Sequence, residues 1–160
     1  MDVLIIGTGN IGKRHLQGAS FLPVSCYDIS RDSLESVRPF CESNKIRIPK
    51  LLPELDDALN TITPETVVIV ATTANGRVPL FKKIVSRNPR EVILEKPACQ
   101  SLSEYKQLMK ITGEGEVYVN IPRTLYPVYQ QIGLEGKHAM FFANSSNAGM
   151  VCNGISVQDD

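Results

Sequence analysis

Residues 3–12 read Val3-Leu4-Ile5-Ile6-Gly7-Thr8-Gly9-Asn10-Ile11-Gly12. The first four residues form a continuous, mostly β-branched apolar run, which is typical of a strand buried on both faces. Glycines at 7, 9 and 12 follow it, and residues 11–19 have the pattern of a helix. This GxGxxG spacing suits a tight turn at Gly7, close approach of a pyrophosphate at Gly9 and close helix–strand packing at Gly12. The stretch therefore predicts a dinucleotide-binding strand–turn–helix unit.

Strands and helices alternate through the rest of the first 120 residues. Apolar runs predict strands at 24–27, 67–71, 92–94 and 117–119, with a short one at 46–48. Helices are expected over 30–37, ending near Pro39, and over 53–59, 77–87 and 101–111. Strands separated by helices of about ten residues predict a doubly wound α/β domain with one parallel sheet. This is the Rossmann architecture.

The composition and pattern of the sequence change after residue 120. A helix is expected over 126–132 and a strand over 139–143, and residues 144–154 are rich in Asn, Ser and Gly. We therefore expect two domains. Residues 1–120 form the dinucleotide-binding domain, and residues 121–160 form only the beginning of a second, α+β domain for substrate binding or oligomerisation.

Charge and cysteine usage narrow the class of protein. The formal net charge is zero, so the sequence gives no electrostatic argument for binding nucleic acid or a membrane surface. The four cysteines (Cys26, Cys41, Cys99 and Cys152) form no CxxC pair and have no histidine at metal-ligand spacing. We expect reduced thiols, no metal and a cytoplasmic location. A catalytic thiol at Cys99 is the alternative for that residue.

An acidic residue ends the second expected strand at the distance that the GxGxxG pattern requires. Asp28 is placed to accept hydrogen bonds from the adenosine ribose, and its charge repels a 2′-phosphate, which favours NAD over NADP. Arg31 would pair with a 2′-phosphate if NADP were bound. The alternative role of Asp28 is a turn or cap before Ser30. The residues expected at the pyrophosphate are Gly7, Thr8, Gly9, Asn10, Ile11 and Gly12, because a helix N-terminus attracts anions.

Further motifs narrow the choice of protein family to which the sequence can be assigned. Glu95-Lys96-Pro97 follows the fifth strand, and Lys13-Arg14-His15 follows the glycine turn. Together with Ala71-Thr72-Thr73 and the run 120–123 (Asn-Ile-Pro-Arg), they resemble the glucose–fructose oxidoreductase/inositol dehydrogenase (Gfo/Idh/MocA) family. The resemblance covers about residues 1–130.

The resemblance implies an NAD(P)-dependent oxidoreductase acting on sugars, cyclitols or sugar nucleotides. Lys96 is then the catalytic residue that contacts the substrate hydroxyl, and Glu95, Ala71, Thr72 and Thr73 lie beside the cofactor. A lysine at the carboxyl end of a strand also suits this role on physical grounds, because open α/β sheets bind ligands there. The alternatives are a solvated Lys96 paired with Glu95, and a helix-packing role for His15.

Three positions depart from the family pattern. Thr73 stands where proline is frequent, Arg77 where histidine is frequent, and Ser156 in the place of a histidine that precedes the matching Asp159. Family members also run well beyond this length. We therefore expect this chain to bind cofactor, to be incomplete for catalysis, and to form a homo-oligomer through its exposed apolar surface.

Two other functions compete with this assignment. The chain would be a nucleotide-binding module without chemistry, acting as a sensor or assembly partner, if the substrate wall were absent. A methyltransferase or a sugar-nucleotide enzyme of the same fold also tolerates the spacing to Asp28, but Glu95-Lys96-Pro97 argues against it.

Overall fold

The computed structural model describes residues 1–112 and 116–121. The chain divides into Met1–Asn120 and Ile121–Asp160, and the description that follows concerns the first unit. The helix and strand expected after residue 125, together with Cys152, Ser156 and Asp159, lie outside the described residues. The beginning of a second domain therefore stays a prediction.

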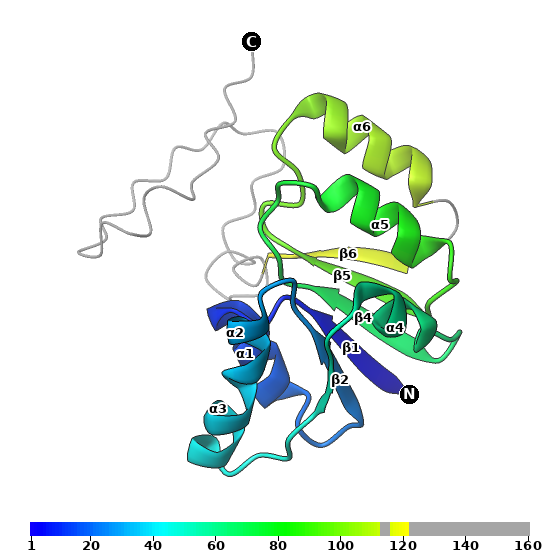
Figure 1. The fold of residues 1–160 in the computed structure, drawn as a ribbon. Coiled ribbons are helices and arrows are strands. Elements are labelled where there is room, and N and C mark those ends of the chain that lie inside the picture. Colours follow the sequence, from blue (N-terminus) through cyan, green and yellow to red (C-terminus); the bar gives the residue numbers. More distant parts are fainter. Residues whose placement is uncertain (113–115, 122–160) are drawn as a thin grey trace, which may run out of the picture. The chain divides into compact units, whose positions relative to one another are not determined.

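A six-stranded, all-parallel sheet runs through the first unit in the order β3-β2-β1-β4-β5-β6 (Figure 1). The strands are β1 (Asp2–Ile6), β2 (Val24–Tyr27), β3 (Lys50–Leu52), β4 (Thr66–Val70), β5 (Glu91–Glu95) and β6 (Glu116–Asn120). β1 is central and pairs with β2 on one side and with β4 on the other. The predicted doubly wound α/β fold is confirmed.

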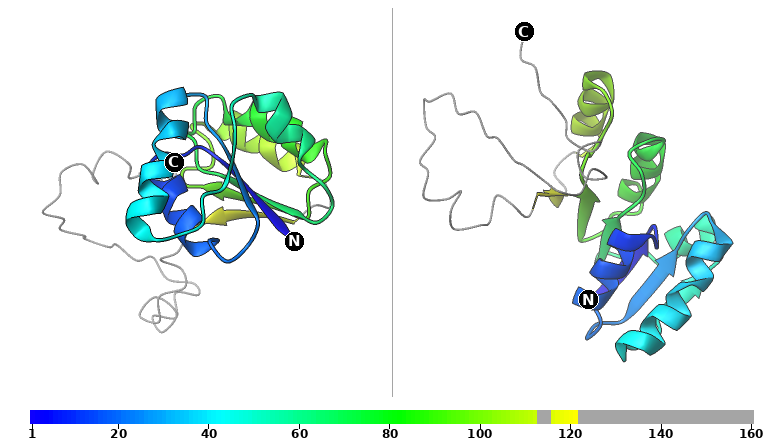
Figure 2. Two further views of the ribbon diagram at one scale, coloured as in Figure 1. Left: turned by 60° about the horizontal axis from the view of Figure 1, so that its bottom comes forward. Right: turned by 90° about the vertical axis from the view of Figure 1, so that its left-hand side faces the viewer.

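Helices cover both faces of the sheet, as Figure 1 and the two views of Figure 2 show. They are α1 (Asn10–Gly18), α2 (Arg31–Glu35), α3 (Val37–Asn44), α4 (Leu55–Asn60), α5 (Arg77–Val85) and α6 (Leu102–Ile111). Helices α1 to α3 pack on one face, and α4 to α6 on the other. Ser30 and Ser101 cap α2 and α6 with their hydroxyls, because each accepts from a backbone N–H three residues on.

The central strand contributes to two hydrophobic cores. Leu4 and Ile6 belong to the core under α4, α5 and α6, whereas Val3 and Ile5 belong to the core under α1, α2 and α3. All four are at most 5% exposed. Successive side chains of a strand point to opposite faces, so a strand covered on both faces must be apolar at every position. This explains the unbroken apolar run before Gly7.

Two sequence-based element boundaries were wrong. The third strand lies at Lys50–Leu52 rather than at 46–48, because the N–H of Ile46 bonds to the carbonyl of Cys41 and closes α3 instead. The helix expected over 30–37 also does not end at Pro39, since α3 continues from Val37 to Asn44. Pro39 lies in the first turn of α3, where a missing N–H removes no intrahelical bond.

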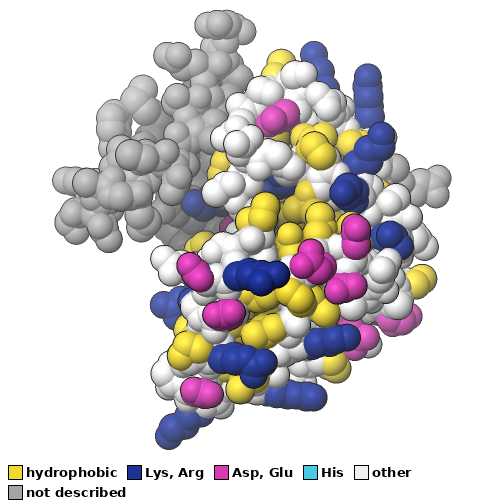
Figure 3. Space-filling model, viewed as in Figure 1, with side chains coloured by type: hydrophobic (Ala, Val, Ile, Leu, Met, Phe, Trp, Pro, Cys, Tyr) yellow, Lys and Arg dark blue, Asp and Glu magenta, His cyan; other side chains and the backbone are white. Residues whose placement is uncertain are grey.

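The surface of the described part carries charges of both signs. Figure 3 shows basic and acidic side chains interspersed over one face, with apolar side chains between the helices. Within residues 1–112 and 116–121, no helix is long and apolar enough to cross a membrane. The same residues contain no group of three or more His, Cys, Asp or Glu side chains that could hold a metal ion.

Candidate functional site

The predicted site residues gather where the carboxyl ends of β1, β2, β4 and β5 meet. The chain leaves β1 toward β2 on one side, while β4 and β5 lie on the other side of β1. Open α/β sheets bind ligands outside the carboxyl ends of strands at such a switch point. The turns after β1, β4 and β5 contain the glycine motif, Ala71-Thr72-Thr73 and Lys96-Pro97 respectively.

The turn after β1 requires glycine at two positions. Gly7 has φ of +100°, and a Cβ there would lie 2.8 Å from the backbone of Ala71 and of Thr72. A Cβ on Gly12 would lie 1.9 Å from the carbonyl oxygen of Gly7. The first glycine therefore brings the β1 and β4 turns into contact, and the third seats α1 against the strand that precedes it.

The middle glycine serves a different purpose. A Cβ on Gly9 would meet no atom of the described residues within 4 Å. Gly9 is also the N-cap of α1, and no side chain caps this helix. The N-terminus of α1 thus faces open space with its first N–H groups uncapped by any side chain. These residues fit the diphosphate of a dinucleotide, because free N–H groups and the helix dipole both favour an anion.

Asp28 follows β2 and is connected to the glycine turn. Its Oδ2 accepts hydrogen bonds from the Thr8 backbone N–H at 2.6 Å and from the Thr8 hydroxyl at 3.0 Å. Its Oδ1 accepts from the Ser30 N–H at 2.8 Å. The carboxylate thus has the turn role that was the alternative for this residue. It is only partly buried. The two bonds from Thr8 use both lone pairs of Oδ2, so the acceptor capacity that remains for a ribose hydroxyl is on Oδ1, which accepts one bond.

Arg31 lies at the start of α2 and points to another partner. Its guanidinium is 4.0 Å from the Glu54 carboxylate, and both side chains are more than half exposed. A surface pair of this kind contributes at most about 1 kcal/mol to stability. Arg31 is therefore free to exchange its partner for another anion.

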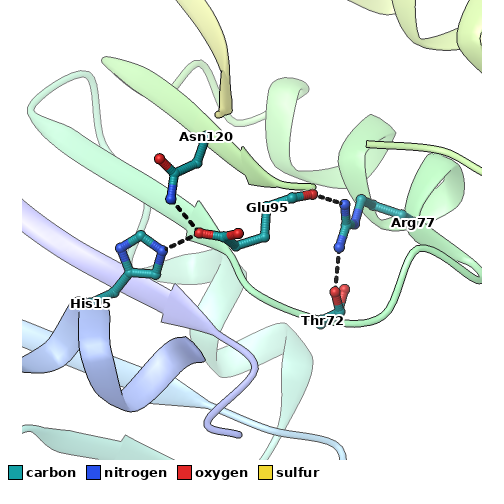
Figure 4. Close-up of polar contacts among 5 residues, drawn as sticks. All are labelled: His15, Thr72, Arg77, Glu95 and Asn120. Atoms are coloured by element: carbon teal, nitrogen blue, oxygen red, sulfur yellow. Dashed lines mark hydrogen bonds and ion pairs between the residues drawn. The ribbon is translucent and has the colours of Figure 1, made fainter. Parts of the chain in front are cut away.

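The Glu95 carboxylate joins three elements at the end of β5, as Figure 4 shows. Its Oε1 lies 2.7 Å from Nε2 of His15 on α1 and accepts a 2.5 Å hydrogen bond from the Asn120 amide on β6. Glu95 is 8% exposed. It pairs with His15 and not with Lys96, so the Glu95–Lys96 pair considered from the sequence does not form. His15 also has a polar partner beyond helix packing.

Lys96 extends away from this network. The residue is exposed, and within residues 1–112 and 116–121 its side chain has no hydrogen bond or ion pair. The peptide bond that joins it to Pro97 is cis. Thr72 is partly buried and Thr73 exposed, with the Thr72 hydroxyl donating to the Thr73 carbonyl at 3.0 Å. The side chains expected at the nicotinamide end are thus available to a ligand.

Arg77 is the residue that sequence reasoning missed, since it was noted only as a departure from a family pattern. It opens α5 and is 1% exposed. Its guanidinium donates to the carbonyl oxygens of Glu95, Thr72 and Pro97 (Figure 4 shows the first two). Burial lowers the pKa of the guanidinium, and the nearby charge of Glu95 opposes that shift. Nothing in the local sequence signals that this arginine points inward.

The family pattern described as "Oxidoreductase family, NAD-binding Rossmann fold" (GFO_IDH_MocA) matches residues 1–121. The chain belongs to the Gfo/Idh/MocA family. The match covers more than half of the chain. It includes every residue expected at the cofactor and the expected catalytic residue, Lys96. The resemblance noted from the sequence motifs is confirmed, and the matched part is the family's NAD-binding oxidoreductase domain.

The individual proteins to which the chain is similar are more distant. The chain is 28% identical over 93 residues to a Δ1-pyrroline-2-carboxylate/Δ1-piperideine-2-carboxylate reductase from Azospirillum brasilense. This match covers 58% of the chain and 28% of the reductase. The scyllo-inositol dehydrogenase from Lactobacillus casei, solved with NAD(H) and scyllo-inositol, superposes with a TM-score of 0.65 at 12% identity. The WlbA dehydrogenase from Chromobacterium violaceum, solved with NADH and UDP-GlcNAcA, gives 0.68 at 16% identity.

The two solved structures show the fold alone at these identities. Each match covers 81% of this chain, but only 38% and 37% of the respective solved chains. The chain thus spans less than two fifths of the length of these relatives. The site described above lies within residues 1–121, which match the family's NAD-binding domain.

Proposed function

We propose that this domain binds NAD(H) in preference to NADP(H), with the diphosphate on the N-terminus of α1. The observation that carries the proposal is the contrast among the three glycines. Atoms of the described residues would collide with a Cβ on Gly7 or Gly12, whereas a Cβ on Gly9 would meet none of them within 4 Å. Packing therefore explains the first and third glycines, and the second is explained by a ligand that approaches the backbone closely.

The preference for NAD rests on Asp28. Its carboxylate is held beside the glycine turn by two bonds from Thr8. A fixed negative charge at this place repels a 2′-phosphate and accepts hydrogen bonds from ribose hydroxyls. Arg31, the residue that would favour NADP, is 4.0 Å from Glu54 in an exposed pair that it can exchange, so the proposed preference rests on Asp28 and not on Arg31.

In the whole protein, the proposed reaction is hydride transfer between a substrate carbinol carbon and the cofactor. The bound cofactor would supply C4 of its nicotinamide as the hydride acceptor or donor. Lys96 is the residue we assign to the substrate oxygen. In the reducing direction its ammonium group would donate a hydrogen bond to the carbonyl oxygen and then the proton that makes the hydroxyl, and in the oxidising direction the neutral amine would accept that proton. Its exposure and its lack of a partner in the described part of the chain support this role.

The substrate class that we propose is a sugar, a cyclitol or a sugar nucleotide. The L. casei and C. violaceum relatives were solved with molecules of these classes. The A. brasilense relative is named for cyclic imine carboxylates, which makes such imines the second class to screen.

The predicted homo-oligomer stays a proposal that light scattering would test.

The first experiment is a titration of this chain with NADH and NADPH, followed by nicotinamide fluorescence. Gly9→Ala should weaken NADH binding about tenfold or more with little change in melting temperature, because only a ligand competes for that space. Gly18→Ala is the matched control, since Gly18 ends the same helix and its Cβ would also meet nothing within 4 Å. Equal NADH binding by both variants would contradict the proposal.

The second experiment concerns chemistry in the complete protein. Lys96→Met should lower kcat about 10²- to 10⁴-fold and leave NADH affinity unchanged, because it removes a proton-moving group but no diphosphate contact. Lys106→Met on the exposed side of α6 is the control. Cofactor binding without turnover of any sugar, cyclitol or imine would instead support a non-catalytic nucleotide-binding module.

A further inference from the structure

The Arg77 side chain connects two loops that come from different strands. One Nη atom donates to the carbonyl oxygens of Glu95 and Pro97, the latter at 2.5 Å, and the other donates to the carbonyl of Thr72. The loops follow β5 and β4. Figure 4 shows the guanidinium between the Glu95 backbone and the Thr72 segment. A single rigid group thus sets the spacing between them.

Lys96 lies in the sequence between Glu95, the last residue of β5, and Pro97, whose two carbonyls accept hydrogen bonds from Arg77. Its backbone is fixed on both sides, at Glu95 and at Pro97, while its side chain remains exposed and unpaired within the described part. On the other loop, the held carbonyl belongs to the residue before Thr73. Arg77 therefore fixes the backbone of the proposed catalytic lysine and that of the nicotinamide-side threonines relative to each other.

The burial of this arginine is costly, and packing alone does not explain it. Transfer of a guanidinium from water to an interior costs several kcal/mol unless its donors are satisfied. No carboxylate lies within ion-pair distance of Arg77 among the described residues, and its Nε has no hydrogen-bond partner there. An apolar side chain would fill the same space without this cost. What arginine adds is a planar set of donors that reaches three carbonyls at once.

We propose that Arg77 is a positioning residue that holds Lys96 and the Thr72–Thr73 segment in the geometry that the nicotinamide end of the cofactor requires. The proposal rests on the proposed function. Among the described residues, Arg77 makes no hydrogen bond to the glycine turn or to Asp28, so the proposal concerns the nicotinamide half of the dinucleotide. Loss of Arg77 should affect the nicotinamide half and spare the adenosine and diphosphate half.

The test compares NADH with ADP-ribose, which lacks the nicotinamide, on this chain and on Arg77→Lys. Lysine retains the charge but carries its donors on one nitrogen and cannot span both loops. We expect ADP-ribose affinity to stay within about twofold and NADH affinity to fall about five- to tenfold. Arg87→Lys is the matched control, because Arg87 is exposed just after the same helix and its guanidinium bonds to the Asn60 side chain rather than to a loop of the site.

Backbone ¹⁵N relaxation provides a readout that needs no cofactor. In Arg77→Lys, the order parameters of the Thr73 and Lys96 amides should fall, while that of Gly12 should not change. Unchanged order parameters at both loops would overturn the proposal. So would an equal loss of NADH and ADP-ribose affinity, since that result indicates only a structural role.

Two further results remain informative. If Arg77→Lys does not fold, NADH added to the unmodified chain should shift the Thr73, Lys96 and Arg77 side-chain resonances, and ADP-ribose should leave them in place. The absence of that difference would overturn the proposal. If the unmodified chain binds ADP-ribose but not NADH, the nicotinamide half of the proposed function fails, and the positioning role fails with it.

Discussion

The carboxylate of Asp28 accepts two hydrogen bonds from Thr8, one from its backbone N–H at 2.6 Å and one from its hydroxyl at 3.0 Å. The two residues are 20 positions apart in the sequence, and their loops follow neighbouring parallel strands. Asp28 thus stabilises the glycine turn in addition to its proposed contact with the ribose. Any substitution of Asp28 will change the turn as well as the ribose site.

Asp28→Asn should affect both properties. The amide retains one acceptor oxygen but loses the charge, so we expect the free energy of unfolding to fall by about 1–2 kcal/mol. NADH affinity should fall about tenfold and the preference for NADH over NADPH should shrink, because a 2′-phosphate no longer meets a negative charge. Urea unfolding and fluorescence titration would measure the two effects.

The control for this change is Asp32→Asn, at an exposed position of α2. Thr8→Val adds a second comparison, since it removes only the hydroxyl donor to Asp28. A loss of stability in Asp28→Asn with unchanged discrimination between NADH and NADPH would assign the carboxylate to the turn alone.

Gly12→Ala should destabilise the fold strongly. The added Cβ would lie 1.9 Å from the Gly7 carbonyl oxygen, which is backbone and cannot rotate away. We expect a loss of about 3 kcal/mol or more, or no folded protein. Gly18→Ala in the same helix has open space around its Cβ and should gain up to about 1 kcal/mol. Equal melting temperatures would show that the close contact does not exist.

Removal of the Glu95 carboxylate should show how much the hydrogen bonds that join α1, β5 and β6 contribute to stability. Glu95→Ala leaves the His15 ring and the Asn120 amide without their acceptor, and we expect a loss of about 1–3 kcal/mol. Glu91→Ala at the other end of β5 removes a weak, partly exposed pair in which the carboxylate is 3.4 Å from Arg90, and it should cost less than about 1 kcal/mol. Chemical denaturation of the two variants would distinguish them, and equal losses would contradict this account.

The buried thiol of Cys26 should make stability depend on pH in the alkaline range. Burial, with a smaller contribution from Cys41, raises the pKa of Cys26 from 9.0 to about 12. The unfolded chain therefore loses this proton near pH 9 while the folded chain retains it. The stabilisation is complete below pH 9 and is lost as pH rises toward 12, with a slope of at most about 1.4 kcal/mol per pH unit.

Urea midpoints at pH 8, 9 and 10 would measure this slope. Cys26→Ala should be less stable at pH 8, because it leaves a small cavity, but its stability should fall less steeply with pH. Cys99→Ala is the control, since Cys99 is only partly buried and packs against the core on the other face of the sheet. Parallel pH profiles for the unmodified chain and Cys26→Ala would refute the prediction.

Local sequence patterns predicted most of the fold. The unbroken apolar runs at 3–6 and 67–71 identified buried parallel strands, because only a strand covered on both faces excludes polar residues at every position. The glycine spacing identified the turn after β1, because Gly12 packs against Gly7 within the same turn. The contact of Gly7 with the backbone of Ala71 and Thr72 is long-range and appears only in the folded structure. The strand at 46–48 was misplaced because the backbone donor of Ile46 is used to close α3, a choice that the alternation of side chains does not reveal.

The order and polarity of the residues in the sequence were thus enough to predict the dinucleotide-binding fold and the position of its glycine turn. They also identified the acidic residue after β2 and the Glu95-Lys96-Pro97 motif. The partners of these residues depended on packing. Glu95 bonds to His15 and Asn120, 80 and 25 positions away, and Arg77 turns inward to carbonyls of two loops. Contacts of this range depend on which strands become neighbours, and a side chain's direction follows from the surface against which its helix is packed.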